Sequence, residues 1–179
     1  MDRALWISWY DLPDNGRDAY LSWLHDTHMK NVVKRPGILW AAHFKSEGAP
    51  IQSGVPRGAH GRLRHTDDPK VPRGNAYILI YGGENAHAFA HPVPSKYRAG
   101  LSKDDQKMIA TRIGERTNLF TDENGIGGPE AGSRDPKQAL SPCIQLGTFN
   151  AADVPEDELL DWYANWRLPS MNRPPGGVG

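Results

Sequence analysis

The feature that most constrains this chain is an internal repeat. Residues 4–40 align without a gap with residues 143–179, each position lying 139 residues further along the 179-residue chain. Six of the 37 aligned pairs are identical, among them Trp23/Trp162 and the Pro-Gly pairs at 36–37 and 175–176. A repeat of this kind indicates that one supersecondary unit occurs twice, so the fold has to be built from that unit.

The first copy is predicted to form a strand, a helix and a second strand. Bulky residues on both alternating faces of 5–10 predict a strand that is covered on both sides. A helix is expected to begin near Arg17 and to end at Pro36-Gly37, followed by a strand over 38–45. The apolar face of this helix falls at three- and four-residue spacings: Tyr20, Leu21, Leu24, His28 and Val32.

The remaining chain supplies further elements, separated by Gly- and Pro-rich stretches. The connection over 46–74 is long for a small domain, and 84–100 is also expected to be irregular. Ser102 is a predicted N-cap. The expected elements are a strand at 75–82, a helix from Lys103 to about Arg116, a short strand at 118–121, a strand at 143–149 and a helix at 155–167.

This order predicts an α+β fold, a ferredoxin-like antiparallel sheet with helices on one face. Residues 1–121 would form the repeat unit, 122–141 a linker and 142–179 a partial second βα repeat. The second copy stops at Gly179, where its second strand should begin. Either the chain is truncated relative to a two-repeat protein, or 143–167 completes the first unit. The helix-free face is expected to carry aromatic residues and a histidine, which favours covering it with a second sheet in a homodimer.

Composition excludes several classes of partner. Lys+Arg and Asp+Glu balance at 21 each, so no electrostatic footprint for nucleic acid or an anionic membrane is present. No apolar run is long enough to cross a bilayer. The single cysteine, Cys143, is expected to be a small buried residue, and a cytoplasmic location is the default.

The local motifs resemble a known family. Trp23 and His28 near the end of the first helix, followed by Pro36-Gly37 and a strand, are similar to the EthD-like family of the dimeric α+β barrel superfamily. The first copy keeps the His of the family's His-x-Pro signature but has Lys30 in place of the Pro. The resemblance implies a ligand pocket beside the sheet, and chemistries that include cyclisation, isomerisation and dehydration.

The candidate catalytic residues are His28 and His43. His28 lies on the apolar helix face, one turn before the end of the helix, and His43 projects from the second strand. Either could move a proton in a sheet-side pocket. The residues expected to bind an apolar, ring-bearing substrate are Trp6, Tyr10, Trp40, Tyr77 and Tyr81. His25 and His28 are three residues apart and could ligate a metal, but no second ligand pair stands near, so no metal and no cofactor are expected.

Two functions of different class follow. The first is a small cofactor-independent enzyme, a cyclase, isomerase or dehydratase, acting on a hydrophobic ring-bearing metabolite by histidine acid/base catalysis. The second is a non-catalytic ligand-binding or assembly module whose aromatic side chains fill the pocket. A haem site with His43 or His87 as axial ligand is a third alternative.

Overall fold

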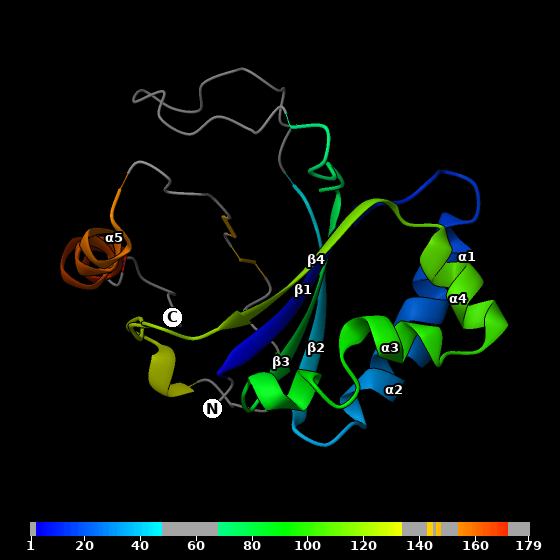
Figure 1. Ribbon diagram of the computed structural model, residues 1–179, viewed down its shortest axis with the longest axis horizontal. Coiled ribbons are helices and arrows are strands. Elements are labelled where there is room, and N and C mark those ends of the chain that lie inside the picture. Colours follow the sequence, from blue (N-terminus) through cyan, green and yellow to red (C-terminus); the bar gives the residue numbers. More distant parts are fainter. Residues whose placement is uncertain (1–2, 48–67, 134–142, 145, 148–153, 172–179) are drawn as a thin grey trace. The chain divides into compact units, whose positions relative to one another are not determined.

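The chain divides into two compact units, Met1–Thr121 and Asp122–Gly179. The computed structural model describes residues 3–47, 68–133, 143–144, 146–147 and 154–171 (Figure 1). Most of the long connection predicted over 46–74 therefore lies outside the described residues.

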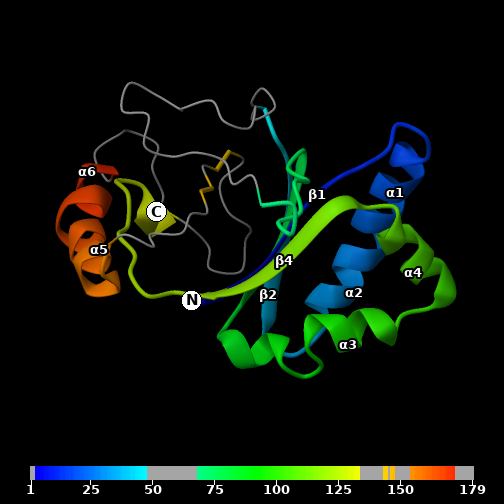
Figure 2. The same ribbon diagram turned by 45° about the horizontal axis from the view of Figure 1, so that its top comes forward.

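The first unit contains a four-stranded antiparallel sheet with its helices on one face (Figures 1 and 2). The strand order is β2-β3-β1-β4, which places β1 in the centre and β4 at an edge. This topology confirms the predicted ferredoxin-like α+β class. The strands are β1 (Ala4–Asp11), β2 (Ile38–Lys45), β3 (Tyr77–Gly83) and β4 (Ile113–Thr121).

The helical segments confirm two predicted helices and add two that were missed. The predicted start at Arg17 and the N-cap at Ser102 are correct, since the Ser102 side chain accepts a hydrogen bond from Asp105 N. The stretch 84–100, predicted to be irregular, holds η2 and α3. The segments are α1 (Arg17–Trp23), η1 (Leu24–His28), α2 (Met29–Val33), η2 (Ala86–Phe89), α3 (Pro94–Ala99) and α4 (Lys103–Ala110).

The first helix contains a π-helical turn, η1, between its two α-helical parts. Tyr20, Leu24, His28 and Val32 are all buried, although they stand four residues apart. At 3.6 residues per turn, twelve residues of regular α-helix would rotate Val32 by about 120° away from Tyr20. The wider π turn absorbs this drift, so the four side chains stay on one face.

The second predicted helix is shorter than expected, and β4 is longer. The helix ends at Ala110 rather than near Arg116, and Ile113 begins a strand that pairs with β1. Gly114 has a φ of +59°, a left-handed conformation that a helix cannot contain and that suits glycine. Ile113 is exposed.

The aromatic residues and His43 lie on the helix-covered face of the sheet, which corrects the prediction that they lie on the open face. Cross-strand register places Trp6 opposite Tyr81 and Tyr10 opposite Tyr77 on this face. The helix-free face is apolar too, and its buried side chains include Ile7, Trp9, Trp40, Ala42 and Ile80. Both faces of β1 are therefore covered, as its sequence predicted.

The second unit contains a helix with the same construction as the first. It comprises α5 (Glu156–Trp162), η4 (Tyr163–Arg167) and α6 (Leu168–Met171), after a short turn η3 (Ala131–Ser133). The bounds of α5 and η4 equal those of α1 and η1 shifted by 139 residues. A repeated unit predicts this coincidence, and the repeat itself stays a prediction.

The other prediction for the second unit is corrected in part. The described residues of the expected strand at 143–149 (143, 144, 146 and 147) lie in no strand, and the others are outside the described residues. Cys143 is exposed rather than buried. The α5–η4 helix exposes large apolar side chains, including Trp162 and Trp166.

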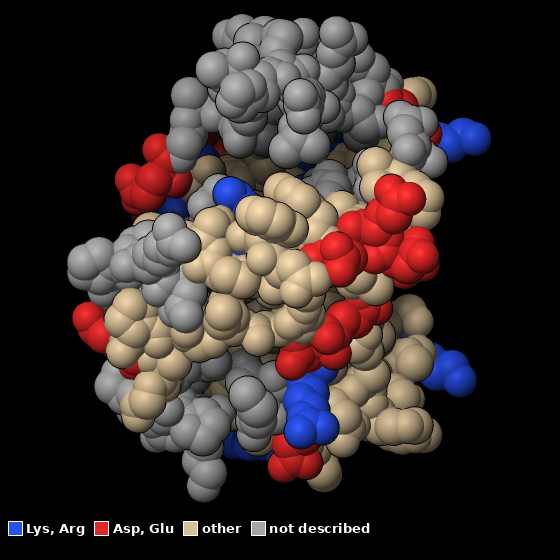
Figure 3. Space-filling model, turned by 90° about the vertical axis from the view of Figure 1, so that its left-hand side faces the viewer, with Lys and Arg blue, Asp and Glu red and all other residues tan. Residues whose placement is uncertain are grey.

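On the face drawn in Figure 3, the acidic side chains of the described residues gather on one side, and the few basic ones form no continuous area. Across the described ranges, no helix is long and apolar enough to cross a bilayer.

Candidate ligand-binding site

Four of the five predicted substrate-binding residues lie together between the sheet and its helices. Trp6, Tyr10, Tyr77 and Tyr81 are all buried in this layer. Trp40 does not join them, because its indole packs on Gly82 on the other face of the sheet. A Cβ built on Gly82 would come within 2.2 Å of Trp40 Cε2.

The edge of the layer at β2 holds a chain of hydrogen-bonded rings. His43 Nε2 lies 2.9 Å from the hydroxyl of Tyr10, and His43 Nδ1 lies 2.9 Å from Nε2 of His25. The His43 ring also stacks on Tyr10 and Tyr77, with centroids 6.0 and 5.4 Å apart. Both nitrogens of His43 are thus occupied, which leaves neither free for a metal or haem ligand role.

A buried cation, Arg112, lies in the middle of the layer. Its side chain is 2% exposed, and its guanidinium carbon lies 4.5 Å from the centre of the Tyr10 ring. Arg112 Nε donates to the Tyr20 hydroxyl at 2.7 Å, and Nη1 donates to Glu115 at 2.6 Å. Arg98 also donates to both oxygens of Glu115, so this carboxylate holds two arginines.

His28 occupies the other end of the layer, among aromatic rings. Its ring stacks on Trp23 at 4.7 Å and lies 6.2 Å from Tyr97 of α3. Trp23 is fixed in turn by a 2.7 Å hydrogen bond from Nε1 to Asp105. His28 is 5% exposed, and its ring nitrogens have no hydrogen-bond partner among the described residues. It is therefore a buried titratable group without a hydrogen bond to the described residues.

Burial controls the protonation of both histidines. Desolvation, followed by the charge of Arg112, lowers the pKa of His28 to about 4. Desolvation, followed by the nearby His25 and Arg112, lowers the pKa of His43 to about 3. Both rings are neutral at pH 7, so each can accept a proton. Burial acts to raise the pKa of Glu115, but Arg112 and Arg98 outweigh it and hold this pKa below its ordinary value.

Four buried donor atoms in and around the layer have no acceptor within the part of the chain that is described. They are Trp6 Nε1, Tyr81 Oη, Arg35 Nη1 and Arg112 Nη2. Trp6 and Tyr81 are cross-strand neighbours whose rings lie 5.0 Å apart. Unpaired buried donors are costly, so a cluster of them requires an explanation such as a bound water or ligand.

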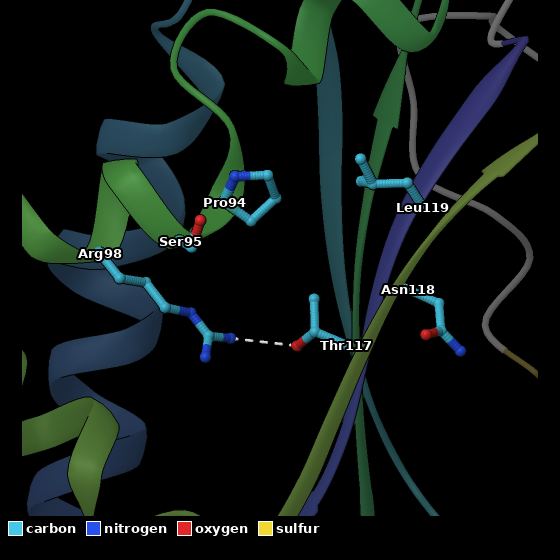
Figure 4. A pocket seen from close by; sticks show the side chains of 6 residues that line it. All are labelled: Pro94, Ser95, Arg98, Thr117, Asn118 and Leu119. Carbon is cyan, nitrogen blue, oxygen red and sulfur yellow. Dashed lines mark hydrogen bonds between the residues drawn. The ribbon is translucent and has the colours of Figure 1, made fainter.

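An open groove of about 530 Å³ runs beside this layer, between the start of α3 and the edge strand β4. Figure 4 shows the Arg98 side chain reaching across it to the Thr117 hydroxyl, at 3.1 Å. The groove is lined by Pro94, Ser95, Arg98, Thr117, Asn118 and Leu119.

His25 and His28 do not come together as a metal site. His25 is exposed and bonds to His43, whereas His28 is buried against Trp23. Within the described ranges, no group of three or more His, Cys, Asp or Glu residues could hold a metal ion. The described His87 is exposed on η2, where its backbone N–H donates to Asn85.

Three residues of this site were missed from the sequence as functional candidates: Arg98, Arg112 and Glu115. Nothing in the sequence near Arg112 indicates that its charge would be buried. Its partner Tyr20 is 92 residues away in the chain. The sequence feature that could have indicated this site is the spacing of Arg112 and Glu115, three residues apart, together with the charge of Arg98.

Comparisons with known proteins do not identify a family. No protein-family description matches the chain, and no curated protein matches it in sequence. Among solved structures, the chain is similar to a monooxygenase from the gene ActVA-Orf6 of Streptomyces coelicolor, in complex with the ligand nanaomycin D. The TM-score is 0.40 at 10% identity, over 70% of this chain and 91% of that chain.

Proposed function

We propose that this chain is a small-molecule enzyme of the dimeric α+β barrel superfamily, with EthD-like local motifs, that needs no cofactor. The substrate would be a hydrophobic, ring-bearing metabolite, and the reaction a cyclisation, isomerisation or dehydration. The observation that carries the proposal is His28, a buried neutral imidazole that has no hydrogen bond to the described residues and is surrounded by aromatic rings.

His28 and His43 would have different roles. A neutral His28 can take a proton from a carbon or hydroxyl group of the substrate and return it at another position. His43 already engages both nitrogens, with Tyr10 and His25, so it would position Tyr10 or pass protons to the exposed His25. Trp6, Tyr10, Tyr77 and Tyr81 would hold the apolar body of the substrate, and Trp40 would support the sheet from behind.

The test is turnover of a panel of aromatic and polycyclic ketones, followed by mass spectrometry and chiral chromatography. Loss of water would identify a dehydration, and a product of unchanged mass a cyclisation or isomerisation. His28→Ala should lose turnover by about a hundredfold or more, the usual share of a general acid or base. His91→Ala, at an exposed position, is the matched control. Full turnover by a folded His28→Ala protein would remove His28 from the mechanism.

The second candidate is a non-catalytic binding or assembly module. The observation that favours it is the packing of the predicted aromatic wall into the core, where its rings contact each other and the helices. This function predicts that ligands bind without chemical change and that His28→Ala alters affinity only.

The homodimer and the cytoplasmic location stay predictions. The helix-free face is apolar, with Ile7, Trp9, Trp40 and Ile80 among its residues, and a second copy of the chain would cover such a face. Light scattering coupled to size exclusion would decide: a mass of twice 19.8 kDa supports the homodimer, and a mass of 19.8 kDa refutes it.

A further inference from the structure

Two of the four unpaired donors, Trp6 Nε1 and Tyr81 Oη, belong to cross-strand partners whose rings lie 5.0 Å apart. Arg35 lies over the Tyr97 ring at 4.7 Å, and Tyr97 lies 6.3 Å from Trp6. The charges of Arg112, Arg98 and Arg35 each act on Tyr81. We call Trp6 Nε1, Tyr81 Oη, Arg35 Nη1 and Arg112 Nη2 the donor cluster.

The charges around the donor cluster are not balanced. Three arginines, Arg35, Arg98 and Arg112, face one buried carboxylate, Glu115, which Arg98 and Arg112 share. Arg35 has no carboxylate partner among its described contacts; its Nη2 donates to the carbonyl of Pro92. Asp105 lies at the rim, where it is held by Ser102 and Trp23. A net positive charge therefore surrounds donors that lack an acceptor.

Burial of this kind is unfavourable unless something supplies the missing acceptor. Every member of the cluster is a donor, and the guanidinium groups and the indole cannot accept a hydrogen bond at all. Water could satisfy the donors, but it would not compensate the positive charge. An anionic oxygen would do both, through charge-assisted hydrogen bonds.

We propose that the donor cluster binds an acidic oxygen of the ligand, so that the substrate class is a ring compound bearing a carboxylate, enolate or phenolate group. The ligand would enter by the groove beside α3, where Arg98 stands. This inference rests on the proposed function, since it names the substrate class of the same site. It also gives the enzyme a means to stabilise an enolate formed when His28 takes a proton.

The experiment compares two probes of the same shape by isothermal titration calorimetry: 2-naphthoate, which carries a carboxylate, and 2-naphthamide, which is neutral. The wild-type protein should bind the carboxylate at least tenfold more tightly than the amide. Tyr81→Phe should reduce the affinity for 2-naphthoate about tenfold and that for 2-naphthamide by much less, because the lost hydrogen bond is charge-assisted only with the carboxylate. Tyr163→Phe, which removes a hydroxyl group from the second unit, is the control.

A carboxylate that binds no more tightly than the amide would overturn the proposal. So would an unchanged affinity in Tyr81→Phe, or a crystal grown with 2-naphthoate in which the four donors bond to water alone. Should Tyr81→Phe fail to fold, Trp6→Phe removes a different donor of the same cluster and has to weaken 2-naphthoate in the same way. Binding and turnover separate the two proposals. Turnover that depends on His28, without a preference for the carboxylate, refutes this inference alone. A preference for the carboxylate, without turnover that depends on His28, refutes the proposed chemistry alone.

Discussion

Acid should destabilise this protein through His28, and the size of the effect follows from its burial. The pKa of His28 is about 4 in the folded chain, against an ordinary value of 6.5. As the pH falls from 6.5 to 4, the unfolded chain takes up a proton at this residue and the folded chain does not. Each unit of difference corresponds to about 1.4 kcal/mol, so the loss attributable to His28 is about 3 kcal/mol.

The measurement is urea unfolding between pH 7.5 and pH 4 for the wild-type protein and for His28→Phe. Phenylalanine keeps a flat ring against Trp23 and cannot titrate. The free energy of unfolding of the wild type, minus that of the variant, should therefore fall by about 3 kcal/mol over this range. His43 titrates in both proteins and cancels. His91→Phe, exposed on the surface, should follow the wild type at every pH. Parallel curves for wild type and His28→Phe would refute the reasoning.

Three further changes test the fold around the site. Glu115→Ala should cost about 3 kcal/mol in the free energy of unfolding at pH 7, because it leaves Arg112 as an uncompensated buried charge; a loss below about 1 kcal/mol would contradict this. Gly82→Ala should cost about 2 kcal/mol by thermal or urea unfolding, since its Cβ would clash with the Trp40 indole; an unchanged stability would show that the indole moves aside. Deletion of Thr27 from the π turn should change the free energy of unfolding by less than about 1 kcal/mol. The eleven α-helical residues that then lead from Tyr20 to Val32 rotate the two side chains only about 20° apart around the helix axis. Insertion of one alanine at the same place should cost more.

The elements that were predicted correctly are those with a local start or stop signal in the sequence. Pro36-Gly37 ends the first helix, and the Ser102 hydroxyl caps the start of α4, so sequence patterns within a few residues suffice. The end of α4 was wrong because residues 111–121 carry no equally strong local signal. Their strand conformation is decided by pairing with β1, more than a hundred residues earlier in the chain.

The site was only partly predictable for the same reason. The alternation of aromatic residues in β1 and β3 placed Trp6, Tyr10, Tyr77 and Tyr81 on one face, and the register confirms this grouping. The alternation could not tell which face the helices cover. Nor could it indicate a buried cation, since the burial of Arg112 depends on where β4 pairs.

The two helices with π turns bear on how the site is distributed over the chain. At the 139-residue shift the geometry of the helix is repeated, but its chemistry is not. The positions of Tyr20, His25 and His28 correspond to Leu159, Ala164 and Arg167. The second helix therefore lacks the tyrosine ring that bonds Arg112, the exposed His25 and the buried imidazole of His28. Since π turns are frequent at functional sites, its presence in both helices fits an inherited scaffold, and the replacement of all three polar residues fits a single site confined to the first unit. Arg167, at the position of His28, stays protonated, so it could not take the place of His28 in a proton-transfer step.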